Sequence, residues 1–444
     1  MFGRKNVKIL LNMALGAAAL TLSGCPITGG GSDTVGGTVT GLIGSGLVLQ
    51  LNGGDSLSFS GSGTFVFGTK LNNSAAYSVT VMTQPSNPTQ TCTVRNGSGA
   101  IDKASIGNVI VACTQTGRFA YVANRQSNSI SAFAIDPSSG ALATLSGSPF
   151  ASNGTTPTAL TVDPNGQFLY VANSGSNSVS AYSIGAAGTL TAVGFPTATG
   201  TGPGAVTVDP TDHFLYVANL TANTVSAFAI NAGALTPVVD SPFSVGAEPA
   251  SLAIDPNGNF LYVTNFNGNT VSVFLIDPAS GMLSAVSGSP FGTGGGPVSI
   301  AIDPTDAFAF VANNSDKTIA SYALNATTGA LTPSGSPLPA GTNPEAVIVD
   351  PTGTYIVAAN AQAPDQVATF TITPGNGALT LSSSSAAGSL PIALAIDPSG
   401  HFLYAVNFNS NDMSAYTVSA TGALAPIAGS PVAVGSQPHA IAID

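Results

Sequence analysis

The chain has 444 residues, more than a single hydrophobic core usually serves, so we expect two or more domains or a repeat architecture. Charged residues make up only 7 % of the chain and hydrophobic residues 44 %, which excludes bulk disorder. The net charge of -11 would repel a phosphate backbone, so we expect no nucleic acid as a partner. The 52 glycines and 30 prolines separate short apolar runs, a pattern typical of an all-β protein.

The first 24 residues have the features of an export signal. Three basic residues, Arg4, Lys5 and Lys8, precede an apolar stretch at 9–22. This stretch is shorter than the roughly 20 residues that a membrane span needs. We therefore expect residues 1–24 to be a cleaved signal peptide.

The end of this segment resembles the lipobox of bacterial lipoproteins. The motif is Leu22-Ser23-Gly24-Cys25, and in lipoproteins the cysteine becomes the lipid-modified first residue of the mature chain. The resemblance implies lipidation of Cys25, with residues 25–36 as a flexible glycine-rich tether to the membrane. It places the protein in the bacterial cell envelope, lipid-anchored and either periplasmic or surface-exposed. A plain secretory signal with an incidental Cys25 is the alternative.

Residues 37–116 predict a small β-sandwich, because short apolar or alternating runs are bounded there by Gly, Asn or Ser. The segment resembles the immunoglobulin-like or carboxypeptidase-regulatory-like modules of exported bacterial proteins. It contains the two remaining cysteines, Cys92 and Cys113, and an oxidising compartment favours a disulfide between them. The alternative is two free thiols at a metal or redox site, which the lack of Cys-x-x-Cys spacing disfavours.

From residue 117 to residue 444 the sequence repeats itself seven times. The motif Tyr-Val-Ala-Asn or a variant of it recurs every 46 to 49 residues and ends at Asn124, Asn173, Asn219, Asn265, Asn313, Asn360 and Asn407. Ten residues before six of these asparagines stands the Asp of an Asp-Pro turn, at Asp163, Asp209, Asp255, Asp303, Asp350 and Asp397. Each unit predicts four short antiparallel strands, and seven such units predict a seven-bladed β-propeller. A solenoid is the alternative.

The end of the chain predicts how the ring closes. Residues 438–444 repeat the first strand of a unit, whereas the first unit begins at its second strand, 119–124. We therefore expect the C-terminal strand to complete the first blade and to cover an otherwise exposed sheet edge. The rival for this place is the segment 109–113, which leads into Thr114.

The repeated motifs carry a family resemblance. Tyr121-Val122-Ala123-Asn124, its variant Tyr-Val-Thr-Asn at 262–265, the Asp-Pro-x-Gly turns and Gly281-Met282-Leu283 look like the YVTN-repeat, lactonase-like seven-bladed propellers. That superfamily includes the propeller type of 6-phosphogluconolactonase and the carboxymuconate-lactonising enzymes. The resemblance covers residues 117–444 and is specific for the fold, whereas it says little about activity.

Few side chains of the propeller can do acid–base chemistry. Its basic residues after Arg118 are Arg125 and Lys317, and its two glutamates are Glu248 and Glu345. The blade topology places Arg125, Glu345 and His439 near one mouth of the central channel. A carboxylate or an imidazole there can act as a general base, and a guanidinium can hold a substrate carboxylate. The alternative is that these are polar residues tolerated at a wet rim.

The other polar residues favour structural roles. We expect His213 and His401 to be exposed turn residues on the opposite face, and the seven repeat asparagines to bond to local backbone. The sequence contains no phosphate-binding loop, dinucleotide fingerprint or metal-spaced cluster, so we expect no cofactor and no metal.

The leading functional expectation is a monomeric envelope module whose propeller face binds a protein, a glycan, a cell-wall component or a small molecule. The alternative is a lactonase acting on an uncharged or carboxylate-bearing lactone. A sugar phosphate would need a cluster of Arg and Lys that the propeller lacks.

Overall fold

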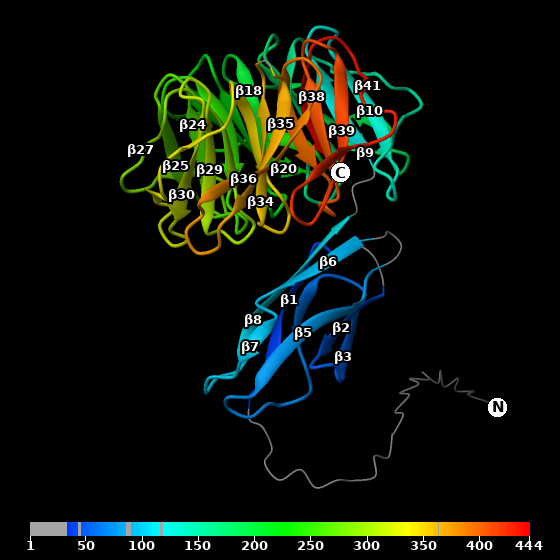
Figure 1. Cartoon of the computed structure of the whole chain (residues 1–444), viewed down its shortest axis with the longest axis vertical. Helices are drawn as coiled ribbons and strands as arrows, with labels where there is room; N and C mark the ends of the chain where they lie inside the picture. The colour runs from blue at the N-terminus through cyan, green and yellow to red at the C-terminus, as the bar shows by residue number, and fades with distance from the viewer. Residues whose placement is uncertain (1–32, 43–45, 86–89, 116–118, 363) are drawn as a thin grey trace, which may run out of the picture.

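The computed structural model describes residues 33–444 except 43–45, 86–89, 116–118 and 363. The predicted signal peptide, Cys25 and the first part of the tether lie outside the described residues and stay predictions. Figure 1 shows an N-terminal β-sandwich below a β-propeller, and every element in the described residues is a strand. The all-β, seven-bladed class predicted from the repeats is confirmed.

The N-terminal domain consists of two four-stranded sheets. The first has the order β4 (Gly63–Val66), β1 (Val35–Thr40), β8 (Ile106–Gln115), β6 (Gln90–Arg95). The second has the order β3 (Asp55–Phe59), β2 (Leu47–Leu51), β5 (Ala76–Thr83), β7 (Ser98–Ala100). Alternate residues of β2 and β8 are fully buried between the sheets, among them Leu47, Leu49, Val109 and Val111. This alternation is what a half-buried strand requires.

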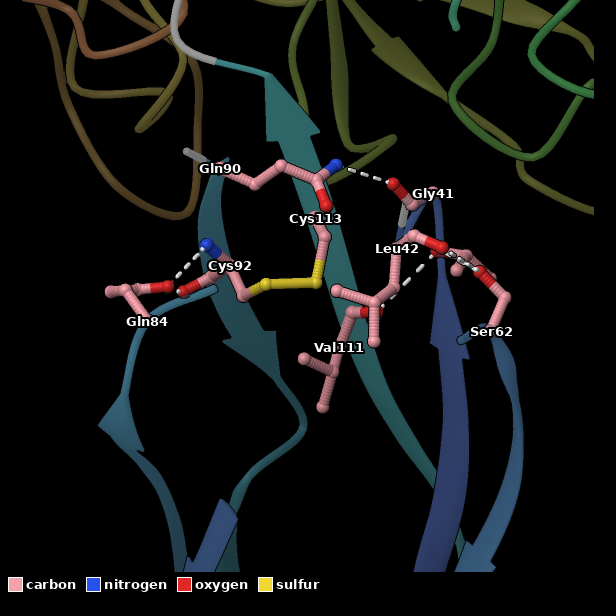
Figure 2. The surroundings of a disulfide bond; sticks show 9 residues. Gly41, Leu42, Ser62, Gln84, Gln90, Cys92, Val111 and Cys113 are labelled. Carbon is pink, nitrogen blue, oxygen red and sulfur yellow. Dashed lines mark hydrogen bonds between the residues drawn. A yellow bond between two sulfur atoms is a disulfide. The ribbon is translucent and has the colours of Figure 1, made fainter. Parts of the chain in front are cut away.

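The predicted disulfide is confirmed. Cys92 on β6 and Cys113 on β8 are direct cross-strand partners, and their sulfur atoms are bonded (Figure 2). The side chain of Gln84 accepts a hydrogen bond from the Cys92 backbone N–H at 2.7 Å and donates one to its carbonyl at 3.0 Å. Gln90 donates to the carbonyl of Gly41 at 2.7 Å. The bridge therefore joins the strand that leads into the propeller to a well-bonded edge strand.

The propeller has seven antiparallel sheets, and each contains one first, one second, one third and one fourth strand. The first strands are β42 (Pro438–Ile443), β13 (Pro157–Val162), β18 (Pro203–Val208), β23 (Pro249–Ile254), β28 (Pro297–Ile302), β33 (Pro344–Val349) and β37 (Pro391–Ile396). The second strands are β9 (Phe119–Asn124), β14 (Phe168–Asn173), β19 (Phe214–Asn219), β24 (Phe260–Asn265), β29 (Phe308–Asn313), β34 (Tyr355–Asn360) and β38 (Phe402–Asn407). The third strands are β10 (Ser129–Ile135), β15 (Ser178–Ile184), β20 (Thr224–Asn231), β25 (Thr270–Ile276), β30 (Thr318–Leu324), β35 (Gln366–Ile372) and β39 (Asp412–Val418).

The outer edge of each blade differs from the simple fourth strand that the repeats predict. The fourth strands are β11 (Leu142–Thr144), β16 (Leu190–Ala192), β21 (Ala234–Pro237), β26 (Leu283–Ala285), β31 (Leu331–Pro333), β36 (Leu379–Ala386) and β40 (Leu424–Pro426). In six blades a two-residue strand follows and pairs with the third strand, namely β12 (Phe150–Ala151), β17 (Thr197–Ala198), β22 (Phe243–Ser244), β27 (Phe291–Gly292), β32 (Leu338–Pro339) and β41 (Val432–Ala433). In the sixth blade β36 is continuous and pairs along the whole of β35.

The core lies between neighbouring blades. The second strands are buried on both faces, since their side chains pack against the blade on either side; Tyr216, Leu261 and Val263, for example, share one cluster. A strand covered on both faces reads as a continuous apolar run, which explains the repeated Phe-Leu-Tyr-Val-Ala. First strands are only partly buried because they line the central channel.

The ring closes as predicted. β42 pairs antiparallel with β9 and brings Pro438 opposite Asn124. Asp444 Oδ1 accepts a hydrogen bond from the Phe119 backbone N–H at 2.7 Å, as Asp163 Oδ1 does from that of Phe168 at 2.6 Å. Asp444 thus forms across the closure of the ring the same contact that Asp163 forms within its own blade. The rival segment 109–113 belongs to β8 of the sandwich.

The repeat asparagines bond differently from the prediction. Asn124 Nδ2 donates to the hydroxyls of Ser129 and Ser131, at 3.2 and 2.9 Å, and Asn219 makes the equivalent pair of contacts. The partners are side-chain hydroxyls of the third strand, so the expectation of local backbone partners was wrong in these blades. The exposed side chains of His213 and His401 contact turn hydroxyls, which confirms their structural role.

Candidate functional site

A β-bulge occurs at the same place in all seven first strands. The pairing register with the second strand shifts directly after the proline that begins each first strand. Seven bulge residues therefore surround one end of the channel: Thr158, Gly204, Ala250, Val298, Glu345, Ile392 and His439. We call this ring the channel mouth. A bulge redirects a side chain and is frequent beside active sites, so Glu345 and His439 occupy positions with functional potential.

His439 is held in one tautomer at the channel mouth. Its Nδ1 lies 2.8 Å from the backbone carbonyl oxygen of Thr158 in the next blade. Because a carbonyl can only accept, Nδ1 carries the hydrogen, and Nε2 of the neutral ring keeps its lone pair. The ring also meets Phe408 edge-on, with 6.1 Å between the ring centroids.

The electrostatics keep this imidazole neutral. Burial lowers the pKa of His439 below its ordinary value of 6.5, and the positive charge of Arg125 lowers it further, although the bond to Thr158 partly opposes this. A neutral ring whose Nε2 is free of its proton at pH 7 is the form that a general base requires.

Arg125 lies beside His439. Its backbone N–H donates to the carbonyl of Gln437 at 2.9 Å, two residues before the histidine, and its side chain is exposed. The residue lines a hollow of about 420 Å³ together with Gln126, Asn128, Thr155, Thr156 and Gln437. The hollow is shallow and open, and His439 is not among its lining residues.

Glu345 belongs to a different part of the ring. Its Oε1 accepts a hydrogen bond from Asn314 Nδ2 at 2.9 Å, and burial raises the pKa of its carboxyl despite this bond. Arg125 and His439 do not contribute to that shift, and the first strand β37 separates β33 from β42. The structure therefore brings together two of the three predicted site residues, Arg125 and His439, and leaves Glu345 with its own partner.

Sequence reasoning missed the groups that orient the histidine. The Thr158 acceptor is a backbone carbonyl, which has no residue signature. Phe408 follows the repeat asparagine of the seventh blade as Arg125 follows that of the first, so the repeat alignment offered a signal for it. The bulge was not foreseeable from spacing, because all seven first strands carry it and the interval from the proline to the turn aspartate is the same in each.

The sandwich faces the other end of the channel. Its residues Arg95 and Ile110 and the turn prolines Pro256, Pro304 and Pro351 border one cavity of about 600 Å³. These turns join first to second strands, on the face opposite the channel mouth. In the described part of the chain, no cluster of three or more His, Cys, Asp or Glu is arranged to hold a metal ion. That part also contains no helix with the length and apolarity of a membrane span.

The sequence matches the family described as lactonase, 7-bladed beta-propeller, over residues 77–157, 141–248, 237–347 and 339–439. The chain belongs to this family. Among curated proteins no sequence matches it.

Solved structures share the family fold. A candidate 6-phosphogluconolactonase from Bacteroides uniformis superposes with a TM-score of 0.66 at 22 % identity, covering 74 % of this chain and 100 % of its own. A protein from Lactobacillus plantarum gives 0.65 at 22 % identity over 74 % and 100 %. The periplasmic gluconolactonase of Pseudomonas aeruginosa gives 0.65 at 21 % identity over 73 % and 98 %. At these identities the likeness establishes the fold alone.

Proposed function

We propose that the protein is a lactonase, with His439 as the general base and Arg125 as the substrate-binding cation. The observation that carries the proposal is the imidazole at the channel mouth, whose Nδ1 donates to the Thr158 carbonyl, with Arg125 bonded through its backbone to Gln437 two residues before it. Membership of the lactonase family supports this reading over the envelope-binding module that composition alone favoured.

The reaction needs one water molecule and no further group. His439 Nε2 takes a proton from water while the oxygen attacks the lactone carbonyl, and the negative charge that develops on the carbonyl oxygen is stabilised by Arg125. The C–O bond of the ring then breaks, and the leaving alkoxide takes the proton back from Nε2. The product is the open hydroxy acid, and the histidine returns to its neutral form.

The charge of the site limits the substrate. After Arg118 the propeller has two Arg or Lys residues, Arg125 and Lys317, and they lie in the loops of different blades, so its described residues form no Arg and Lys cluster for a phosphate dianion. We therefore propose a neutral lactone, or one with a single carboxylate, as the substrate class. A gluconolactonase among the fold relatives is consistent with a neutral sugar lactone.

The place of action remains the one proposed from the sequence. An exported, lipid-anchored protein would meet lactones in the periplasm or at the cell surface, with the membrane contacted through Cys25. We propose a monomer with the channel mouth as its ligand-binding face.

The test is a panel of neutral, carboxylated and phosphorylated lactones, assayed with the wild type and with His439→Gln and His401→Gln variants. His401 is the control because it is an exposed turn histidine on the opposite face. We expect turnover of neutral or carboxylated lactones, a fall of roughly 100-fold or more in kcat for His439→Gln, and no change for His401→Gln. Equal rates in all three proteins would refute the proposal, and the envelope-binding module would then become the better reading.

A further inference from the structure

A second set of asparagines, one in each of five blades, holds the backbone around the channel mouth. Each lies in the loop between second and third strands, has a positive φ, and accepts a hydrogen bond through Oδ1 from a backbone N–H of the next blade. The pairs are Asn128 with Thr156, Asn177 with Gly202, Asn223 with Glu248, Asn269 with Gly296 and Asn411 with Gln437, at 2.7 to 2.9 Å. We call each of these contacts a loop latch.

The latch donors directly precede the bulges, and three of the five, Thr156, Glu248 and Gln437, are non-glycine residues with a positive φ. Gln437 has a φ of 51° and precedes Pro438, which precedes His439. A side chain other than glycine is disfavoured in this left-handed region by about 1 kcal/mol or more, so the conformation persists only where its surroundings hold it. The Asn411 Oδ1, 2.7 Å from Gln437 N, is such a support.

The latch acts on the orientation of the histidine. Gln437 is tied on one side to Asn411 through its N–H and on the other to the Arg125 N–H through its carbonyl. Two residues later, the bulge aims the His439 ring so that Nδ1 reaches the Thr158 carbonyl. The path from Asn411 to the imidazole is therefore a short stretch of backbone fixed at each step.

The other titratable bulge residue lacks this support. In the fifth blade, which precedes that of Glu345, the latch position holds Lys317, with a φ of 59°. A lysine side chain has no acceptor and cannot take a hydrogen bond from Asn343, the residue that corresponds to Gln437. The latch thus distinguishes the base of the proposed reaction from the glutamate.

We propose that Asn411 is a positioning residue that keeps His439 in its catalytic tautomer. The catalytic role of this tautomer rests on the proposed function. The tautomer itself can be observed without any substrate. Without the latch, Gln437 can relax out of the left-handed region, the bulge loosens, and the imidazole leaves the Thr158 carbonyl for water. Its pKa then rises, because burial is the main cause of the lowered value.

The charges around the ring do not complicate this expectation. Arg125 is the charged group that acts on the His439 pKa. Asp412, next to Asn411, accepts hydrogen bonds from Asn407 and Ser410 of its own blade.

The experiment is nitrogen NMR of the histidine rings in the full-length protein, across a pH titration. The chain has only three histidines, so the His439 signals can be assigned with a His439→Gln reference. The variants are Asn411→Ala, Asn411→Asp, which keeps the acceptor, and Asn223→Ala, which removes an identical latch next to the bulge residue Ala250.

In the wild type we expect the Nδ1–H form and a pKa below 6.5. In Asn411→Ala we expect a mixture of tautomers, a pKa shifted up toward 6.5, and a kcat at least 10-fold lower with a matching upward shift of the acid limb of the pH–rate profile. Asn411→Asp should restore the Nδ1–H tautomer, although its added negative charge raises the His439 pKa. Asn223→Ala should leave the His439 spectrum unchanged even where it lowers the melting temperature.

An unchanged His439 spectrum in Asn411→Ala would overturn the positioning role, as would the same change in Asn223→Ala. Failure of the proposed function has a different signature: a wild type that hydrolyses no lactone while its histidine spectra behave as described.

Discussion

A buried and a half-buried carboxyl group, those of Asp163 and Asp212, lie near each other across a blade boundary on the face opposite the channel mouth. Asp163 is 3 % exposed, and its Oδ1 accepts the backbone N–H groups of Gln167 and Phe168. In the described structure its Oδ2 has no hydrogen-bond partner, and neither has Oδ1 of Asp212 in the next blade. Burial, and to a smaller extent the negative charge of Asp212, raise the pKa of Asp163 to about 6. Replacing Asp212 by Asn should therefore stabilise the protein at neutral pH.

The magnitude follows from linkage. A rise of the Asp163 pKa from 3.8 to about 6 corresponds to about 3 kcal/mol at 1.36 kcal/mol per pKa unit. Because the pKa of Asp163 is raised in the folded state, its protonated carboxyl contributes this free energy to the stability of the fold. The contribution is complete below pH 3.8 and is lost as the pH rises through 6. Burial is the largest cause, so we assign about 1 kcal/mol to Asp212 and expect Asp212→Asn to gain that much at pH 8 and nothing at pH 4.

The assay is urea unfolding of the propeller at pH 4 and pH 8, followed by the fluorescence of its tyrosines. Asp240→Asn is the matched control, because Asp240 lies on the same blade and is exposed. A gain of equal size at both pH values, or a gain for Asp240→Asn as large as that for Asp212→Asn, would refute the reasoning. So would the absence of any gain at pH 8.

Three further outcomes are expected. Asp306→Asn should reproduce the pH-dependent gain, because burial and the neighbouring Asp255 raise the pKa of Asp306 to about 6; a pH-independent effect would contradict this. Deleting residues 438–444 should cost the propeller several kcal/mol, and an unchanged melting temperature would argue against closure by β42. Replacing Cys92 and Cys113 by Ser should destabilise the sandwich by about 3 kcal/mol in calorimetry while leaving lactone turnover intact.

The fold was predictable because the sequence of each repeat predicts its strands independently of the other repeats. Seven copies of one apolar run and six Asp-Pro turns agree on the same four-stranded unit, and the surplus first strand at 438–444 indicates where the ring joins. The two-residue outer strands were missed, although a Ser-Pro dipeptide directly precedes five of the six, β12, β22, β27, β32 and β41.

The candidate site was predictable only in part. Blade topology placed Arg125, Glu345 and His439 on one face, since loops alternate between the faces of the disc. Topology does not say which blades lie near enough for side chains to interact, and Glu345 proved to contact Asn314 instead. The tautomer of His439 depends on the carbonyl of Thr158, a group that every residue possesses. Composition also favoured a binding module, because the number of ionisable groups says nothing about the orientation of a single one such as His439.

The seam between β9 and β42 sets an order of events for folding. The hydrogen bond from Phe119 to Asp444 joins residues 325 positions apart, whereas the other blades close within their own repeats. During synthesis from the N-terminus, blades two to seven can pair as they appear, but the first blade keeps an open edge until β42 is made. His439 lies in that final strand. The proposed catalytic group is therefore assembled in the same step that completes the ring, so that an unfinished propeller is inactive as well as open.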